Sequence, residues 1–250
     1  MNNLYNYGWN DSLQQLKEQS NYRELLNARV AVTHKTCYDV ITEIEMLSCE
    51  LSGNIMFGRE PSEYPCTGDW VIIQKTDEAK GIILDILPRK KVLYRLKAGT
   101  VSERQAIASY VDKAFVVQSL DDNFNVRRIE RFLLQLSESD IEAVIVLTKS
   151  DLEFSRDEVE KALLHLKGKY PMCYTSIHSP ESIENLRKLI SQGETVVFTG
   201  SSGVGKSTLI NKLVGQEVLE TSHISNSTGK GRHTTTRREM ILLAGSGVLI

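Results

Sequence analysis

The sequence predicts a mostly parallel α/β domain preceded by a small all-β barrel of the OB type. The barrel is predicted from residues 28 to 87, where short β-like runs recur at roughly ten-residue spacing with glycines and prolines between them. The α/β domain is predicted from the chain after residue 99, where strand-like and helix-like runs alternate. Such alternation is typical of a parallel sheet with helices on both faces.

Length and composition are those of an ordinary soluble globular protein. The chain has 250 residues, of which 41% are hydrophobic and 25% charged, and this length suffices for one large domain or two smaller ones. No apolar run approaches the roughly 18 residues of a membrane span, and the polar N-terminus does not resemble a secretory signal. Four widely separated cysteines (Cys37, Cys49, Cys66 and Cys173) lack the paired spacing of zinc or redox sites. We therefore expect a cytoplasmic protein with reduced thiols and no membrane association.

The first part of the chain is expected to contain two units. Residues 1–27 are expected to form an N-terminal helical extension, with one or two short helices within 13–26. Residues 28–97 are expected to form the barrel. Its predicted strands are 29–33, 39–47, 69–74 and 81–87, with turn residues at Gly53, Gly58, Pro61 and Pro65.

The α/β domain is expected to occupy residues 98–250. An apolar, β-branched run predicts a strand at 114–119 and a further apolar run predicts a buried strand at 143–147, with shorter strands expected at 172–174 and 195–199. Apolar residues at helical spacing predict helices at 126–136, 157–166, 180–190 and 208–214. The last predicted strand runs directly into a glycine-rich turn.

That turn has the sequence GSSGVGKS at residues 200–207 and fits the pattern G-x-x-x-x-G-K-[ST] at every fixed position. Glycines allow backbone N–H groups to surround phosphate oxygens, and the helix that follows adds its positive end. Lys206 would reach the β- and γ-phosphates, and the Ser207 hydroxyl would bind Mg²⁺. The strand–loop–helix context argues against a chance glycine-rich turn. The predicted phosphate-binding residues are Gly200, Ser201, Ser202, Gly203, Val204, Gly205, Lys206, Ser207 and Thr208.

The segment TKSD at residues 148–151 follows a predicted buried strand and indicates which base is bound. GTPases recognise guanine with [N/T]-K-x-D at such a strand end. Asp151 would accept hydrogen bonds from the guanine ring N–H and amine, Lys149 would pack its stem over the base, and Thr148 completes the set. Buried polar groups made for one base would be left unpaired by another. The alternative is a helix N-cap at Ser150 or Asp151.

A third segment, YTSI at residues 174–177, would complete the base pocket. It follows a predicted strand at the point where GTPases place a small polar turn, so Thr175 and Ser176 are candidates to support the guanine carbonyl. The order of the segments is unusual, because TKSD precedes the phosphate loop by about 50 residues. A circular permutation leaves every strand in place while moving the chain ends, so the pocket survives.

Further along, the segment GKGRHTTT at residues 229–236 is a candidate switch. Thr234 or Thr235 is suited to close over the γ-phosphate and give Mg²⁺ a second hydroxyl. His233 could orient the attacking water, or it could be a surface side chain near RNA or a loop hydrogen bond. The three threonines could otherwise form an edge strand.

Together these motifs resemble the circularly permuted ribosome-small-subunit-dependent GTPase A family, the bacterial ribosome assembly GTPases. The resemblance covers residues 28 to 250. It extends to YPCTGDWV at 64–71, LPRKKVLYR at 87–95, QAIASYVD at 105–112 and GRHTTT at 231–236, although Ser109 and Tyr110 replace the usual Ala-Asn.

The resemblance implies GTP hydrolysis stimulated by the small ribosomal subunit, during late maturation of that subunit, by a protein we expect to be monomeric. It also implies that the barrel contacts ribosomal RNA. The net charge of −2 excludes coating of nucleic acid through overall charge, so RNA must meet a local patch, and we expect no DNA partner. The candidate RNA-binding residues are Arg89, Lys90, Lys91, Arg95 and Lys97. A solvated linker is the alternative, while Arg127, Arg128 and Arg131 are expected on a solvent-facing helix surface.

Two parts of the family pattern are missing from the sequence. The family has a D-T-P-G turn after the strand that follows the switch, and a Cys/His zinc module beyond it, whereas this sequence stops at Ile250 in the apolar run 247–250. GTP or GDP with Mg²⁺ is therefore the expected ligand set, and no zinc module is present in the chain. We expect weakened nucleotide binding. The alternatives are a nucleotide-regulated RNA-binding module without hydrolysis and a P-loop ATPase or kinase.

Overall fold

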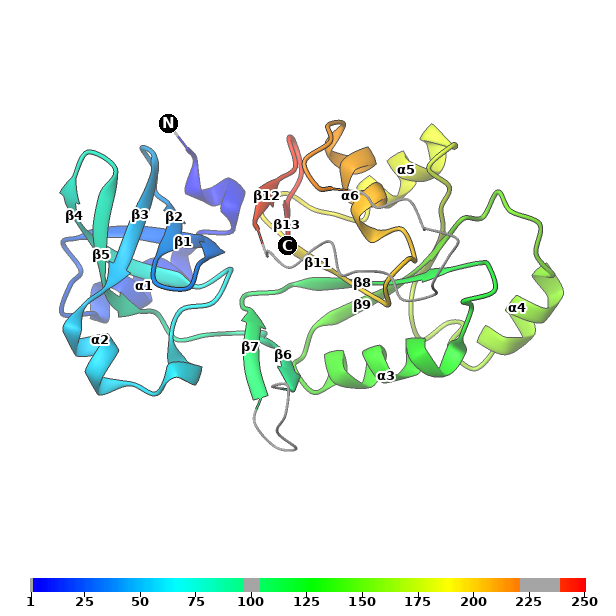
Figure 1. The fold of residues 1–250 in the computed structure, drawn as a ribbon, viewed down its shortest axis with the longest axis horizontal. Helices are drawn as coiled ribbons and strands as arrows, with labels where there is room; N and C mark the ends of the chain where they lie inside the picture. Colours follow the sequence, from blue (N-terminus) through cyan, green and yellow to red (C-terminus); the bar gives the residue numbers. More distant parts are fainter. Residues whose placement is uncertain (1, 97–103, 221–238) are drawn as a thin grey trace.

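The computed structural model describes residues 2–96, 104–220 and 239–250. A closed barrel lies at one end of the molecule and a larger sheet covered by helices at the other, with a small hairpin between them (Figure 1). This arrangement confirms the predicted fold class, an OB-type barrel followed by a mostly parallel α/β domain. Within the described ranges, none of the helices is both long enough and apolar enough to cross a lipid bilayer.

The barrel closes in the strand order β1-β2-β3-β5-β4, with β1 paired to β4. Its elements are β1 (Leu26–Thr33), β2 (Tyr38–Ile41), β3 (Met46–Leu51), α2 (Gly53–Gly58), η2 (Pro61–Glu63), β4 (Trp70–Asp77) and β5 (Lys80–Ile86). The short helix between β3 and β4 permits the parallel pairing of β3 with β5, since parallel neighbours need a crossover connection.

The single strand predicted at 39–47 is wrong, because two antiparallel strands occupy this region. The Thr42 hydroxyl accepts hydrogen bonds from the Ile44 and Glu45 backbone N–H groups and donates to the Glu45 carbonyl. This local turn reverses the chain between β2 and β3. Threonine hydroxyls can close such turns. The turn was not predicted because Thr42 follows β-branched residues that are typical of a strand.

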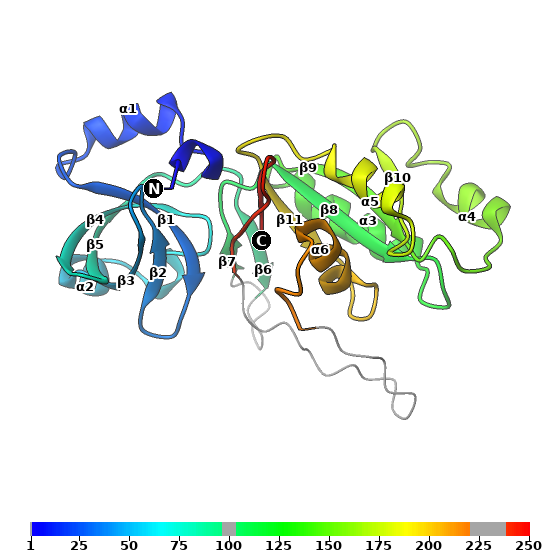
Figure 2. The same ribbon diagram turned by 90° about the horizontal axis from the view of Figure 1, so that it is seen from above.

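The N-terminal extension contains η1 (Leu4–Tyr7) and α1 (Asp11–Gln19), and α1 lies across one side of the barrel (Figure 2). The helix predicted within 13–26 therefore starts earlier and ends earlier than expected. Asn10 starts it, because its side chain accepts a hydrogen bond from the Leu13 N–H at 3.1 Å. Trp9 packs edge-on against Trp70 of β4 with 4.9 Å between the ring centroids, and this contact joins the extension to the barrel.

A two-stranded antiparallel hairpin, β6 (Leu93–Leu96) and β7 (Arg104–Ala108), follows the barrel. It was not predicted, because this part of the chain is rich in charged residues and lacks a continuous apolar run. Leu93 and Ala108 are nevertheless buried and pack into the same cluster as the large sheet. The hairpin is thereby attached to the α/β domain.

The large sheet has the strand order β10-β9-β8-β11-β13-β12. Its strands are β8 (Lys113–Ser119), β9 (Glu142–Thr148), β10 (Met172–Tyr174), β11 (Thr195–Thr199), β12 (Ile241–Leu242) and β13 (Val248–Leu249). Only β12 runs antiparallel to its neighbour. The strands predicted at 114–119, 143–147, 172–174 and 195–199 are present.

Helices cover both faces of this sheet, as Figure 1 shows. They are α3 (Val126–Ser137), α4 (Arg156–Leu163), α5 (Pro180–Arg187) and α6 (Lys206–Val214). Successive side chains of β8 point to opposite faces of the sheet: Val116 packs with α3 and α4, whereas Val117 packs with α5 and α6. Both apolar stripes are thus buried, which holds the loops at the strand ends on a rigid frame.

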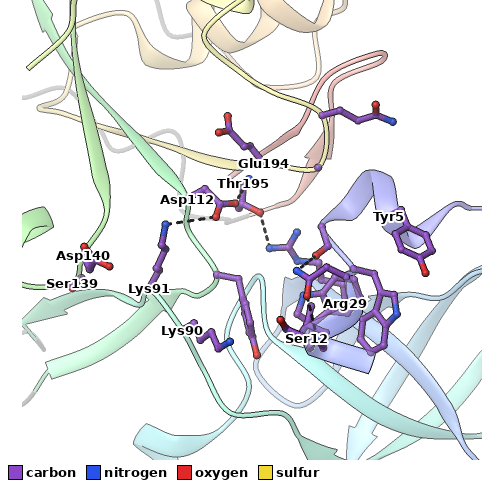
Figure 3. A pocket seen from close by; sticks show the side chains of 18 residues that line it. Tyr5, Ser12, Arg29, Lys90, Lys91, Asp112, Ser139, Asp140, Glu194 and Thr195 are labelled. Atoms are coloured by element: carbon purple, nitrogen blue, oxygen red, sulfur yellow. Dashed lines mark hydrogen bonds and ion pairs between the residues drawn. The ribbon is translucent and has the colours of Figure 1, made fainter. Parts of the chain in front are cut away.

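Arg29 of β1 joins the barrel, the N-terminal extension and the large sheet. Its side chain is buried, with 1% of the residue exposed, and it donates to the Gly68 carbonyl at 3.1 Å, to the Tyr7 carbonyl and to Thr195 Oγ1 at 2.8 Å. Burial lowers the pKa of Arg29 to about 10, so it stays charged at neutral pH. A cavity of about 750 Å³ lies beside it, and Figure 3 shows Arg29 directed at Thr195, the first residue of β11.

Candidate functional site

The predicted site segments meet at one edge of the large sheet. Strands β8, β9, β10 and β11 are parallel, so the loops that follow them all leave from their carboxyl ends. Ligands of open α/β sheets bind in the crevice at this edge. Strand β8 lies between β9 and β11, which places the ends of β9 and β11 about 10 Å apart, twice the usual strand spacing.

The phosphate loop (residues 200–207) requires glycine at its two ends. Gly200 has φ of +150°, and a Cβ there would lie 2.4 Å from the Val117 carbonyl oxygen. Gly205 has φ of +91° and directly precedes α6. The backbone thus takes a path that other residues rarely adopt, and it ends on the positive N-terminus of a helix. Such a loop is built to surround an anion.

Lys206 places its ammonium group inside the loop. Its Nζ donates to the Gly200 carbonyl at 2.9 Å and to the Ser201 carbonyl at 2.6 Å. Burial lowers the pKa of this lysine, because a charged group loses hydration there. A phosphate group in the loop would restore favourable interactions to a cation already in position.

The base-recognition segment (residues 148–151) is hydrogen-bonded directly to the phosphate loop. Thr148 Oγ1 donates to the Val204 carbonyl at 2.7 Å, and Lys149 Nζ donates to the Gly203 carbonyl at 3.3 Å. Lys149 Nζ also pairs with Asp121 at 2.6 Å. Two segments that are distant in sequence are therefore held as one unit. Thr148 uses its hydroxyl on the loop, so its contacts support a bracing role rather than the predicted contact with the base.

Asp151 is an exposed carboxylate held by the turn that follows β10. A hydrogen bond from Ser176 is the main cause that lowers the pKa of Asp151, which keeps the carboxylate ionised as a hydrogen-bond acceptor. The Ser150 N–H donates to the Thr175 carbonyl at 3.1 Å, tying the two segments together. Ser182 fixes the turn, because its hydroxyl accepts from the Ser176 N–H and donates to the Ser176 carbonyl, both at 3.0 Å.

A pocket of about 230 Å³ opens between these segments. It is lined by Thr148, Lys149, Asp151, Leu152, Thr175, Ile177, His178, Gly205, Thr208 and Leu209. The Thr175 hydroxyl is buried there without a hydrogen-bond partner among the described residues. Buried hydroxyls normally have a partner, so an unpaired hydroxyl on a residue that lines this pocket is unusual.

Several residues of this site lie outside the sequence motifs and were not predicted. Asp121 holds Lys149, Ser182 holds the Ser176 turn, and His178 lines the pocket. Arg128 donates to the Ser201 hydroxyl at 3.1 Å, although it was expected to face solvent. A signal existed for Asp121, since it follows a predicted buried strand at the same edge. The predicted switch residues His233, Thr234 and Thr235 lie outside the described residues.

The candidate RNA-binding residues within the described ranges differ in their contacts. Arg89 is engaged by the buried Asp69 carboxylate at 2.7 Å and by the Tyr64 carbonyl, so its contacts support a role in holding the chain after β5. Lys90 and Lys91 are exposed and line the 750 Å³ cavity. Arg95 is exposed and lines a second pocket of about 350 Å³ together with Arg104 and Arg131, and Ser139 lines both this pocket and the 750 Å³ cavity. Lys97 lies outside the described residues.

The order of the segments in the sheet defines the class of protein. Strand β9 with its base-recognition segment precedes β11 with its phosphate loop, the reverse of an unpermuted GTPase, yet both lie beside β8. The fold and the site are those of a circularly permuted P-loop GTPase. Residues 86–250 match the family model described as RsgA GTPase.

Named relatives and solved structures agree with this class. The small ribosomal subunit biogenesis GTPase RsgA 1 of Bacteroides thetaiotaomicron is 59% identical over 249 residues, covering 100% of this chain and 70% of the relative. The RsgA 2 of Lactiplantibacillus plantarum is 36% identical, with 99% of this chain and 70% of the relative covered. The crystal structure of YjeQ from Thermotoga maritima superposes with a TM-score of 0.64 at 25% identity, over 90% of this chain and 73% of that one. The crystal structure of YloQ, a circularly permuted GTPase, superposes with a TM-score of 0.61 at 21% identity, over 92% of this chain and 72% of that one.

The chain belongs to the RsgA GTPase family. It is thus a GTPase that binds guanine nucleotides. It spans about 70% of the length of the two relatives compared above.

Proposed function

We propose that this protein binds GTP and hydrolyses it to GDP and phosphate as an assembly factor of the small ribosomal subunit. It acts in late maturation of that subunit, which stimulates hydrolysis. Relatives named small ribosomal subunit biogenesis GTPase, one of them 59% identical over the whole chain, support this assignment. We place the protein in the cytoplasm as a monomer, with residues 1–27, 28–97 and 98–250 as its three units.

The hydrogen bond of 2.7 Å from Thr148 to the Val204 carbonyl carries the nucleotide assignment. It fixes the base-recognition segment against the phosphate loop, so that one nucleotide spans both. Asp151 accepts hydrogen bonds from guanine, Lys149 packs over the base, and the turn at Thr175 and Ser176 supports the guanine carbonyl.

The phosphate loop, residues 200–207, together with Thr208, holds the phosphates of this nucleotide. Ser207 and a switch threonine, Thr234 or Thr235, would hold Mg²⁺, which would supply positive charge to the phosphates. Lys206 contacts the same phosphates. Water, oriented by His233, adds to the γ-phosphorus as its bond to the bridging oxygen breaks.

Lys90, Lys91, Arg95 and Lys97 supply phosphate contacts to ribosomal RNA. The exposed side chains of Lys90, Lys91 and Arg95 support this role, whereas the contacts of Arg89 favour a structural one. Because two of these residues line the cavity between the barrel and the sheet, RNA would contact the junction of the two parts.

A hydrolysis assay with and without purified small ribosomal subunits tests the proposal. Phosphate release from GTP should rise when subunits are added. Lys206→Ala should abolish both GTP binding and phosphate release. Lys212→Ala is the matched control, because Lys212 is exposed on the same helix and should leave both unchanged. GTP binding without hydrolysis, even with subunits present, would instead identify a nucleotide-sensing RNA-binding module.

A further inference from the structure

We propose that Arg128 supplies a second cation to the terminal phosphate of the bound nucleotide. The proposal rests on the nucleotide orientation given under the proposed function. It adds a residue of α3, a helix that carries none of the motifs of the nucleotide site. The ligand group is the γ-phosphate of GTP, which GDP lacks.

Arg128 and Lys206 meet on one residue of the phosphate loop. The Arg128 Nη1 atom donates to the Ser201 hydroxyl at 3.1 Å, while the Lys206 Nζ atom donates to the Ser201 carbonyl at 2.6 Å. The two cations come from different helices, since Arg128 lies in the first turn of α3 and Lys206 begins α6. Arg128 therefore lies at the phosphate end of the site, away from Asp151.

The charge around Arg128 favours an anion. Among the described residues no carboxylate pairs with it: Asp121 is bound to Lys149, and Glu130 of the same helix is bound to His165. The first turn of α3 has no acidic residue. Cations are disfavoured at a helix N-terminus, so this arginine has an uncompensated charge beside a loop built for phosphate.

The chemistry of the guanidinium suits this role. Its contact with Ser201 uses Nη1, while Nη2 and Nε remain as donors for phosphate oxygens in a planar fork. Arg128 is only partly buried, so part of its side chain is accessible to a ligand. Negative charge shifts towards the bridging oxygen as the terminal phosphate leaves, and a nearby arginine stabilises that charge.

Arg128→Ala and Arg127→Ala form a matched pair for the test. Arg127 is the adjacent residue, exposed on the same helix turn, and its loss changes the net charge equally. The affinities for GDP and for a non-hydrolysable GTP analogue are measured for both variants, with the single-turnover rate of GTP hydrolysis. Arg128→Ala should weaken analogue binding and slow hydrolysis about tenfold or more, the effect of one charge-assisted hydrogen bond. GDP affinity should stay within about twofold of the native protein, and Arg127→Ala should change none of the three.

Two results would overturn the proposal. Equal losses of GDP and analogue affinity in Arg128→Ala would mean that Arg128 only braces the loop through Ser201. Unchanged analogue binding and hydrolysis would mean that it does not contact the phosphate. Arg128→Gln repeats the comparison with a side chain of similar length, should the alanine variant fold poorly. Failure of the native protein to bind GDP would count against the proposed function instead.

Discussion

Asp151 determines the choice of base in this account, because its two carboxylate oxygens match two donors on guanine. Asp151→Asn replaces one of these acceptors with an N–H donor, which suits the C2 carbonyl of xanthine. The variant should therefore prefer xanthosine over guanosine nucleotides in a competition assay. Asp157→Asn, an exposed substitution on α4, should keep the native preference. If guanine selectivity survived in Asp151→Asn, the base would be recognised elsewhere.

The carboxylate of Asp121 makes the stability of the fold depend on pH. Burial alone would raise the pKa of its carboxyl, but hydrogen bonds from Lys149, Ser119 and the Asn123 backbone outweigh burial and lower it. A lowered pKa in the folded state means that the pair stabilises the fold above the unfolded pKa of about 4 and loses this effect as pH falls further.

Comparison with Asp121→Asn tests this pH dependence. The native protein should be more stable than the variant by about 1 kcal/mol at pH 7, and this difference should shrink below about pH 4. Denaturant unfolding at both pH values measures it. A difference that is constant with pH would show that the carboxylate charge contributes nothing.

Single residues also mark the limit of sequence-based prediction. Lys206 and Asp151 could be placed because their neighbours form local motifs that follow buried strands. The roles of Thr148, Asp121 and Arg128 depend on loops that meet only when the sheet assembles. An arginine on a polar helix surface has the same sequence signature whether it faces water or a phosphate loop.

At the level of elements, the hydrogen bond between the end of β9 and the phosphate loop should affect nucleotide affinity. Thr148→Val keeps the shape of the side chain but removes the hydrogen bond to the Val204 carbonyl. Loss of this hydrogen bond should reduce the free energy of GDP binding by about 1 kcal/mol, which is about fivefold in affinity. The reason is that the base-recognition segment and the phosphate loop would no longer be held together. Calorimetric titration of GDP measures this effect. Thr148→Ser, which retains the hydroxyl, should bind GDP nearly as well as the native protein; equal losses in both variants would contradict the bracing role.

Elements with long apolar runs were predicted well and short or charged ones poorly. Strands β8 and β9 are buried on both faces, so each contains a continuous apolar run, 114–117 in β8 and 143–147 in β9. The hairpin β6–β7 carries exposed charges and packs only through a few buried residues such as Leu93 and Ala108. Its pairing comes from tertiary contact, which local sequence does not record.

At the scale of the whole molecule, Arg29 links parts of the chain that are far apart in sequence. Arg29→Met should lower the free energy of unfolding by about 2 to 3 kcal/mol, because three buried acceptors lose their donor. Denaturant unfolding measures the change. Arg23→Met, on an exposed arginine, should have almost no effect. A stability equal to that of the native protein would show that Arg29 does not hold the junction.

The permuted order also belongs to this scale. Motif spacing alone predicted it, and the sheet explains it, since β8 lies between the two strands whose ends carry the site. The position of the barrel against the sheet could not be predicted. It rests on tertiary contacts such as the hydrogen bond from Arg29, which sits in an ordinary strand sequence, to Thr195, and the packing of Val32 and Trp70 with Met240 and Val248.

A crystal structure with bound GDP tests the central claim most directly. We expect the diphosphate inside the loop around Lys206 and the edge of guanine on the Asp151 carboxylate, within one continuous site. A nucleotide bound with its base away from Asp151, or with its phosphates outside the loop, would contradict it.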